Sequence, residues 1–260
     1  MHIDILTSGI WQTTSTILSQ DGACIVVDPA YFPRELDAIV ARVGELGRAA
    51  AMVFTHGHWD HVMGHAALPE APVYVSRVLA ESIARGDARA AKYLEDARDF
   101  DGRWYVPRAS GYHWPAALHG LGEGSPTELA GLALRPLELP GHSPDGLGLI
   151  VEDVLLVGDY LSPCEIPFID DARAYRATLS RLLELLPGVR HVIPGHGPRL
   201  TAIEAAAIAR GDVEYLDRLL AAHDLAAALA IELPRAANVP GMADHHRENC
   251  AKLLGENSAG

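Results

Sequence analysis

The sequence has few cysteines, few basic residues and no long hydrophobic run. Its three cysteines among 260 residues, Cys24, Cys164 and Cys250, are too few and too far apart for a disulfide framework. Lys and Arg number 21 against 34 Asp and Glu, so the net charge is −13, which disfavours binding to nucleic acid or to an anionic membrane. No apolar run approaches the roughly 20 residues of a membrane span, and the first residues lack the pattern of a secretory signal. The sequence therefore predicts a cytoplasmic protein that binds neither nucleic acid nor membranes.

Short β-rich runs alternate with helical periodicity along the chain. Pro33–Leu46 has apolar residues at helical spacing, and Ser76–Ala97 is also predicted to be helical. Phe100–Gly124 is rich in Trp, Tyr, Gly and Pro and is predicted to be irregular. From about residue 200 the pattern is helical and starts with a capping box of Thr201 and Glu204. This order predicts an α/β or α+β sandwich with helices after it.

The most informative stretch follows an apolar strand predicted at Ala51–Phe54. Three imidazoles and one carboxylate, those of His56, His58, Asp60 and His61, occur there within six residues. Imidazole and carboxylate together are the ligands that zinc prefers. Such a pattern arises by chance after a given His with a frequency on the order of 10⁻⁴. The stretch therefore predicts a metal site.

This motif resembles the signature of the metallo-β-lactamase superfamily, which needs three further ligands in a set order. His142 follows the predicted strand Leu132–Leu139, Asp159 follows another strand, and His196 lies in Pro194-Gly195-His196-Gly197. Each follows an apolar strand and lies beside a glycine, which lets the backbone turn the ligand inward. The resemblance covers residues 1 to about 200. It implies a four-layer αββα sandwich of the metallo-β-lactamase type with C-terminal helices.

The resemblance implies two metal ions that share one carboxylate. The ligands of one ion would be His56, His58 and His142, those of the other Asp60, His61 and His196, and the shared ligand Asp159. Five histidines suit zinc best, so two zinc ions are expected, with iron or manganese as alternatives. In the diiron oxygen-reducing branch of the family the second motif histidine is a glutamate, and His58 departs from that pattern.

The function that the resemblance implies is hydrolysis of a small-molecule ester, thioester or lactone, as in the glyoxalase II and lactonase branches. A hydroxide bridging the metals would attack the carbonyl carbon, and Asp60 would orient that hydroxide and accept its proton. The sequence departs from both branches. Pro194–Pro198 lacks the longer motif of the glutathione-dependent branch, and Ser162 stands where the lactonases have tyrosine.

Two alternatives come from other classes of protein. One is a mononuclear iron oxygenase resembling persulfide dioxygenase, which would use only His56, His58, His142 and Asp159 as its ligand set. The other is a metal-bound scaffold without catalytic activity. The metal content of the native protein distinguishes the first alternative from a dizinc hydrolase.

The expected domains are residues 1–200 as the metallo-β-lactamase-like domain and residues 201–260 as a helical extension. Residues 77–125 would form a helical and aromatic insertion within the first. Its segment 104–114 is interpreted either as a lid over the metals or as an interface, so a homodimer remains an open alternative. Seven residues are candidates for the substrate pocket. They are Trp59, Trp104, Trp114, Tyr160, His245, His246 and Asn249.

Overall fold

The computed structural model describes residues 1–124, 127–235, 237 and 239–255. Residue 125, the last of the expected insertion, and residues 236, 238 and 256–260 of the expected extension therefore lie outside the described residues. The chain divides into two compact units. Unit 1 comprises Met1–Glu138 and Asp145–Glu152, and unit 2 comprises Leu139–Pro144 and Asp153–Gly260.

Unit 1 contains a six-stranded sheet in the order β1-β2-β3-β4-β5-β6 and an antiparallel meander β7-β8-β9. Strands β1 to β3 are antiparallel to their neighbours, and β3 to β6 are parallel. Parallel strands are typically buried on both faces, and β3 and the end of β4 consist of apolar residues. The strands are β1 (His2–Thr7), β2 (Thr14–Gln20), β3 (Ala23–Val27), β4 (Arg48–Val53), β5 (Val73–Ser76), β6 (Leu118–Leu121), β7 (Thr127–Leu129), β8 (Leu132–Glu138) and β9 (Leu147–Val151).

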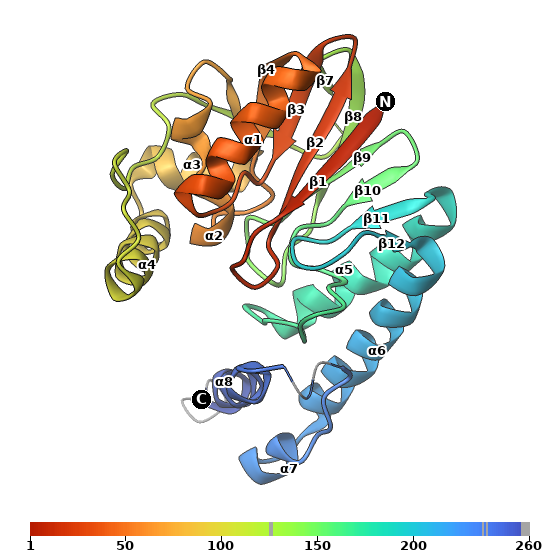
Figure 1. Cartoon of the computed structure of the whole chain (residues 1–260). Coiled ribbons are helices and arrows are strands. Elements are labelled where there is room, and N and C mark those ends of the chain that lie inside the picture. Colours follow the sequence, from red (N-terminus) through yellow and green to blue (C-terminus); the bar gives the residue numbers. More distant parts are fainter. Residues whose placement is uncertain (125–126, 236, 238, 256–260) are drawn as a thin grey trace. The chain divides into compact units, whose positions relative to one another are not determined.

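The helices of unit 1 lie in the connections between these strands. They are α1 (Pro33–Leu46), α2 (Trp59–Val62), η1 (His65–Ala67), α3 (Arg77–Arg85) and α4 (Ala88–Trp104). Helix α1 has the bounds that its periodicity predicts, and it packs on β2, β3 and β4 with Ile39 and Val43 buried (Figure 1). These side chains join one apolar core with residues of β2 to β5, α3 and α4. Burial of this face, rather than helix propensity alone, holds α1 on the sheet.

The prediction that Ser76–Ala97 is helical is confirmed, but two helices rather than one occupy the segment. Gly86 has a left-handed backbone (φ 61°) that ends α3, and the side chain of Asp87 caps α4 by accepting a hydrogen bond from the Ala90 amide at 3.1 Å. The prediction that residues 100–124 are irregular is wrong in part. Helix α4 continues to Trp104, and β6 pairs in parallel with β5.

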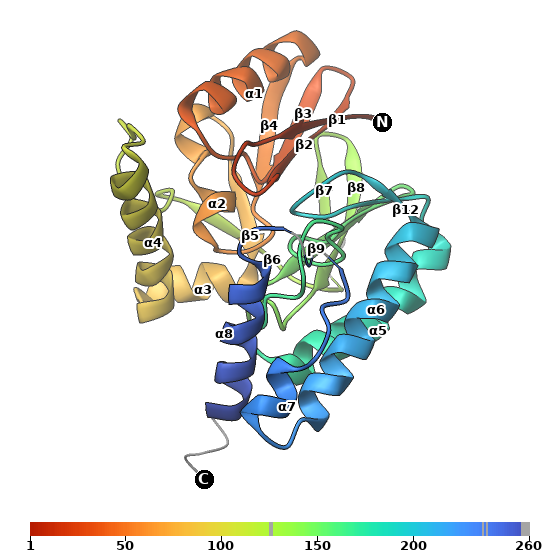
Figure 2. The same ribbon diagram turned by 60° about the horizontal axis from the view of Figure 1, so that its bottom comes forward.

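Unit 2 combines a short sheet with four α-helices in its described residues. Strand β10 pairs in parallel with β11, which pairs antiparallel with β12. Helices α5 and α6 lie side by side, and α8 contacts both α6 and α7 (Figure 2). The elements are β10 (Val154–Leu156), α5 (Ala172–Leu185), η2 (Leu186–Gly188), β11 (His191–Ile193), β12 (Leu200–Thr201), α6 (Ala202–Ala221), α7 (Leu225–Leu229) and α8 (Met242–Gly255).

Two polar contacts fix α6. The predicted capping box is confirmed, because the Thr201 amide donates to Glu204 at 2.8 Å and the Glu204 amide donates to the Thr201 hydroxyl at 3.3 Å. Farther along the helix, buried Asp212 pairs with Arg235, which also donates to the carbonyl of Ser162 at 2.6 Å. Burial raises the pKa of Asp212 to about 6, and Arg235 opposes that rise. In the part of the chain that the structure describes, no helix has the length and apolarity to cross a membrane.

Candidate metal centre

In unit 1 the predicted ligands lie where β4 ends and α2 begins. His56, Asp60 and His61 are buried, and His58 is partly exposed. His56 Nε2 lies 3.0 Å from His58 Nδ1, and His61 Nε2 lies 3.3 Å from Asp60 Oδ2. The motif loop therefore presents two pairs of donor atoms, one from His56 and His58 and one from Asp60 and His61.

Asp28, which directly follows β3, orients two of these imidazoles. His61 Nδ1 donates to Asp28 Oδ2 at 3.0 Å, and the Thr55 amide and hydroxyl donate to the same carboxylate at 2.7 and 2.6 Å. Because the only hydroxyl proton of Thr55 goes to Asp28, its oxygen accepts from His56 Nδ1 at 3.1 Å. Both imidazoles therefore carry their proton on Nδ1, and Nε2 is the atom of each that could ligate a metal ion.

A second buried carboxylate, that of Asp145, holds the backbone of the motif loop. It accepts hydrogen bonds from the Gly57 amide at 2.8 Å and from the Tyr93 hydroxyl at 3.0 Å. Burial and the Asp145 charge raise the pKa of Tyr93, so its hydroxyl stays protonated and remains a donor. A Cβ atom at Gly57 would lie 2.2 Å from Tyr93 Cε2, so only glycine fits between His56 and His58.

In unit 2 three separate loops bring their predicted ligands to one carboxylate. His142 follows β8 in sequence, Asp159 follows β10, and His196 follows β11. His142 Nε2 lies 3.1 Å from Asp159 Oδ2, and His196 Nε2 lies 3.3 Å from Asp159 Oδ1. Each oxygen of Asp159 therefore faces a different imidazole.

Tyr160 is placed beneath this cluster rather than at a surface. Its buried hydroxyl donates to the carbonyl of Pro140 at 2.8 Å and accepts from the amide of His142 at 3.0 Å. Burial raises the pKa of Tyr160, which keeps the hydroxyl protonated. The side chain predicted to line the pocket thus fixes the backbone that carries His142.

Asn249 on α8 acts on the same ligand from farther away. His142 Nδ1 donates to the carbonyl of Phe168 at 3.0 Å, so the position of that carbonyl sets the ring orientation. The Asn249 side chain donates to Pro167 O at 2.8 Å and accepts from the Ile169 amide at 3.2 Å, which holds Phe168 from both sides. Asn249 therefore anchors the segment that orients His142.

The two histidines of α8 differ in their surroundings. His245 packs its ring on Phe168, with the ring centres 5.2 Å apart. His246 is buried and lies 2.8 Å from the Tyr215 hydroxyl through Nδ1. Of this pair, His245 is the one that lies beside the support of His142.

The tryptophans predicted for the pocket fall into two places within unit 1. Trp59 stacks on Phe100 with ring centres 4.5 Å apart, and Trp104 lies 6.4 Å from the same ring. Trp114 instead donates through Nε1 to the carbonyl of Ala90 at 3.2 Å and packs against the apolar core. The structure therefore brings Trp59 and Trp104 together and separates Trp114 from them.

The segment predicted to be a lid or an interface is tied to α4 by a buried ion pair. Arg108 Nε donates to Asp101 at 2.5 Å, and both side chains are almost fully buried. The hydroxyls of Tyr31 and Tyr112 donate to the same carboxylate at 2.7 and 3.1 Å. Opening the segment would require these hydrogen bonds to the Asp101 carboxylate to be broken.

The donor atoms in each unit fit metal ligation in chemistry and spacing. Ligands that lie 2.0–2.1 Å from a tetrahedral zinc are about 3.3 Å from one another. The donor pairs lie 3.0 to 3.3 Å apart in unit 1 and 3.1 to 3.3 Å apart in unit 2. Sequence reasoning missed the supporting carboxylates of Asp28 and Asp145. Asp28 could have been found, because it follows an apolar strand as the ligands do.

A family model described as the metallo-beta-lactamase superfamily matches residues 8–196, which include all seven predicted ligands. The chain belongs to this superfamily. A probable metallo-hydrolase of Burkholderia pseudomallei is 25% identical over 217 residues, which are 72% of this chain and 69% of that protein. A hydroxyacylglutathione hydrolase of Anaeromyxobacter dehalogenans is 32% identical over 146 residues, 56% of this chain but only 44% of that enzyme.

Solved structures of the superfamily share the fold. A metallo-β-lactamase family protein from Thermus thermophilus matches with a TM-score of 0.69 at 21% identity, over 99% of this chain and 94% of its own. A protein crystallised in a di-iron-bound form matches with a TM-score of 0.60 at 28% identity, over 78% of this chain and 96% of its own. The predicted metallo-β-lactamase fold with C-terminal helices is confirmed.

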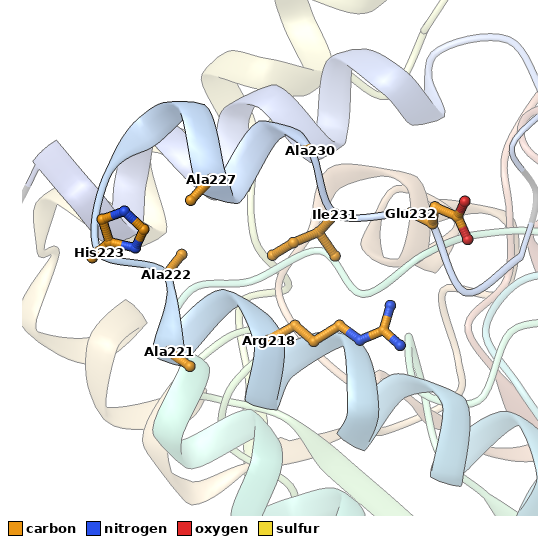
Figure 3. Close-up of a pocket in the computed structure, with 8 residues that line it drawn as sticks. All are labelled: Arg218, Ala221, Ala222, His223, Ala227, Ala230, Ile231 and Glu232. Atoms are coloured by element: carbon orange, nitrogen blue, oxygen red, sulfur yellow. The ribbon is translucent and has the colours of Figure 1, made fainter.

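Unit 2 also has a hollow that carries none of this chemistry. It lies between the end of α6 and α7 and has a volume of about 520 Å³ (Figure 3). Alanine and Ile231 side chains form much of its wall, and Arg218, His223 and Glu232 are its titratable residues. None of these residues belongs to the predicted ligand set, so the hollow is not a candidate for the metal centre.

Proposed function

We propose that this superfamily member is a dinuclear zinc-dependent hydrolase of a small-molecule ester, thioester or lactone. The supporting observation is the Asp159 carboxylate, whose two oxygens face His142 and His196 separately. One carboxylate shared in this way suits two neighbouring cations, because it offsets charge on both. A mononuclear site would need only one of these two imidazoles beside Asp159.

In this proposal the two ligand sets are those that the resemblance to the superfamily implies. One set would be His56, His58 and His142, the other Asp60, His61 and His196, with Asp159 common to both. Two bound zinc ions would supply an activated water at neutral pH and polarise the substrate carbonyl, so that no side-chain nucleophile is needed. The names of the two curated relatives, both hydrolases, agree with this chemistry.

The role proposed for Asp60 is to orient the attacking water and to take up its proton. The carboxylate is buried, and its Oδ2 lies 3.2 Å from the Thr13 hydroxyl oxygen, whose single proton it shares with the Ile10 carbonyl at 2.8 Å. A carboxylate held in this way can act without reorganisation during the reaction. His61 Nε2 lies 3.3 Å from the same oxygen.

The rival proposals predict other metals and other reactions. A mononuclear iron oxygenase would leave Asp60, His61 and His196 without a metal, and a scaffold would bind metal without turnover. Because this chain is similar to a protein solved in a di-iron-bound form, iron stays among its candidate metals. Metal identity must therefore be measured together with activity.

The test combines elemental analysis of the purified protein with a substrate panel. The panel contains 4-nitrophenyl esters, S-lactoylglutathione and an N-acyl homoserine lactone. We expect two zinc ions per chain and turnover of at least one substrate class that is lost after chelation and restored by zinc. One iron per chain with oxygen consumption on a persulfide, or tightly bound metal with no turnover, would overturn the proposal.

A further inference from the structure

Unit 1 has an aromatic groove of about 540 Å³ that the metal ligands do not occupy. It lies among the turn between β1 and β2, the start of α1, the motif helix α2 and the second half of α4. Its apolar wall is made of Ile10, Trp11, Phe32, Trp59, Phe100 and Trp104. Trp11 is 53% exposed and Trp104 is 63% exposed, although side chains of this size usually bury their apolar surface.

The groove is lined in part by the predicted metal-binding loop. Trp59, which lines the groove, stands between His58 and Asp60 in the sequence. On the other side, the turn that carries Trp11 ends at Thr13, whose hydroxyl oxygen lies 3.2 Å from Asp60 Oδ2 and 2.8 Å from the Ile10 carbonyl. A molecule with its reacting group at the metal ligands could therefore extend into the groove without leaving unit 1.

The turn that carries Trp11 is held in place before any ligand binds. Glu35 accepts hydrogen bonds from the Ser8 hydroxyl at 2.6 Å and from the Gly9 amide at 2.8 Å. It also accepts from the amides of Tyr31 and Phe32, each at 3.2 Å. A groove wall fixed in this way costs little conformational entropy on binding, which favours affinity for a small ligand.

The charges at the rim narrow the class of ligand. Asp96, Asp99 and Arg103 line the groove, Asp96 is paired with Lys92, and the whole chain carries a net charge of −13. The lining therefore offers an anionic group no excess positive charge, and Asp99 and the net charge of the chain would repel it. The lining suits an uncharged apolar chain or ring.

We infer that this groove binds the uncharged apolar acyl part, alkyl or aryl, of the substrate that the metal centre hydrolyses. The inference rests on the proposed function and narrows its substrate class to hydrophobic acyl esters, thioesters or lactones. It disfavours acyl groups that carry a carboxylate. The volume of about 540 Å³ lies within the range of small-molecule sites.

Binding can be tested apart from turnover, because three of the four tryptophans line the groove. Octanamide, an uncharged amide, is titrated into the protein and the intrinsic tryptophan fluorescence is followed, with acetamide as the short-chain reference. We expect saturable octanamide binding that Trp11→Ala and Trp104→Ala each weaken about tenfold. Tyr105→Ala, which removes an aromatic ring that is 91% exposed and does not line the groove, should leave the affinity unchanged.

Kinetics then link the groove to the reaction. Of 4-nitrophenyl acetate and 4-nitrophenyl octanoate, the octanoate ester should have the higher kcat/KM. The variant Trp104→Ala should lower the ratio of the two kcat/KM values about tenfold, while its metal content stays the same. The rim charges are tested with the mono-4-nitrophenyl ester of suberic acid, whose acyl chain ends in a carboxylate. It should be a poorer substrate than the octanoate ester, and Asp99→Asn should narrow the difference.

The outcomes separate this inference from the proposed function. If octanamide binding depends on Trp11 and Trp104 but no substrate turns over, the groove assignment stands and the hydrolase proposal fails. If esters turn over with no dependence on acyl length or on these tryptophans, the hydrolase proposal stands and the groove assignment is wrong. A dimer that Trp11→Ala and Trp104→Ala dissociate, with no octanamide binding, would show that the groove is an interface between two copies of the chain and would overturn the inference.

Discussion

The two units supply their predicted metal ligands in different ways. In unit 1 four ligands come from one stretch of six residues, and two carboxylates, Asp28 and Asp145, hold that stretch directly. In unit 2 three ligands come from loops up to 54 residues apart in sequence, and His142 and His196 each lie beside one carboxylate oxygen of Asp159. The first arrangement depends on the supports of one loop. The second depends on one ligand and on the packing of the loops around it.

The largest loss of bound metal is expected from Asp159→Ala in unit 2. Removing the shared carboxylate takes a ligand from both proposed ions and leaves their charge uncompensated, so metal content should fall more than for any other single-ligand variant. Elemental analysis after dialysis measures this, with His142→Ala and His196→Ala as the comparison. Two metals retained by Asp159→Ala would show that this carboxylate is not shared.

The next largest loss of metal affinity is expected from Asp28→Asn in unit 1. An asparagine can still accept from the Thr55 amide, but its NH₂ group is only a donor and can accept neither from His61 Nδ1 nor from the Thr55 hydroxyl. Metal affinity should fall about 10- to 100-fold, as is typical when the hydrogen-bond partner of a ligand is lost. Competition with a chromophoric chelator measures the affinity, and an unchanged value would mean that the motif loop needs no support from Asp28.

A smaller loss of metal affinity is expected from Asn249→Ala, because Asn249 acts on His142 only through the segment around Phe168. The variant leaves the Pro167 carbonyl and the Ile169 amide without their partner, which should cost about 1–3 kcal/mol of the free energy of unfolding. Metal affinity should fall less than for Asp28→Asn. Urea unfolding and the same chelator competition measure the two effects, and a loss of affinity equal to that of Asp28→Asn would contradict this ranking.

The smallest expected effect is on the free energy of unfolding and its dependence on pH. It involves Glu35, which holds the turn between β1 and β2 in unit 1. Burial alone would raise the pKa of Glu35, but hydrogen bonds from Gly9, Ser8, Phe32 and Tyr31 hold it below its ordinary value of 4.5. The stabilisation by Glu35 is therefore fully present above pH 4.5 and is lost as the pH falls through the lower pKa of the folded state.

The variant Glu35→Gln removes this titration. Near neutral pH it should lower the free energy of unfolding by about 1 kcal/mol, because the hydrogen bonds to a charged acceptor become neutral ones. Denaturant unfolding at several pH values should show the difference between the two proteins shrinking as the pH falls below 4.5. A difference that does not change with pH would show that the charge of Glu35 does not contribute.

The same contrast explains what the sequence could predict. Ligands next to one another, as in His56 to His61, form a pattern that is visible without a fold. Asp28 escaped notice because a single carboxylate after a strand is common, and only the folded chain shows that it lies 3.0 Å from His61 Nδ1. Asn249 was singled out as a pocket residue, but its amide is engaged by Pro167 and Ile169, contacts that join positions more than 75 residues apart.

The aromatic residues show the same limit. The concentration of rings in residues 104–114 was visible, but the sequence did not separate Trp104, beside Phe100, from Trp114, which packs on the apolar core. Trp11 was not singled out, because its place in the groove depends on how the β1–β2 turn meets α2 and α4. The break at Gly86 was missed because the apolar periodicity continues across it.

The bond from Asn249 to the Phe168 segment also sets an order of events during synthesis. A ribosome releases the chain from its N-terminus, so His142, Asp159 and His196 all emerge before Asn249 does. Until α8 has been made and has docked, the carbonyl that orients His142 lacks its anchor on both sides. The cluster in unit 2 therefore reaches its final geometry late, and a nascent chain that stalls before residue 249 would present all three of its ligands without the support that orients one of them.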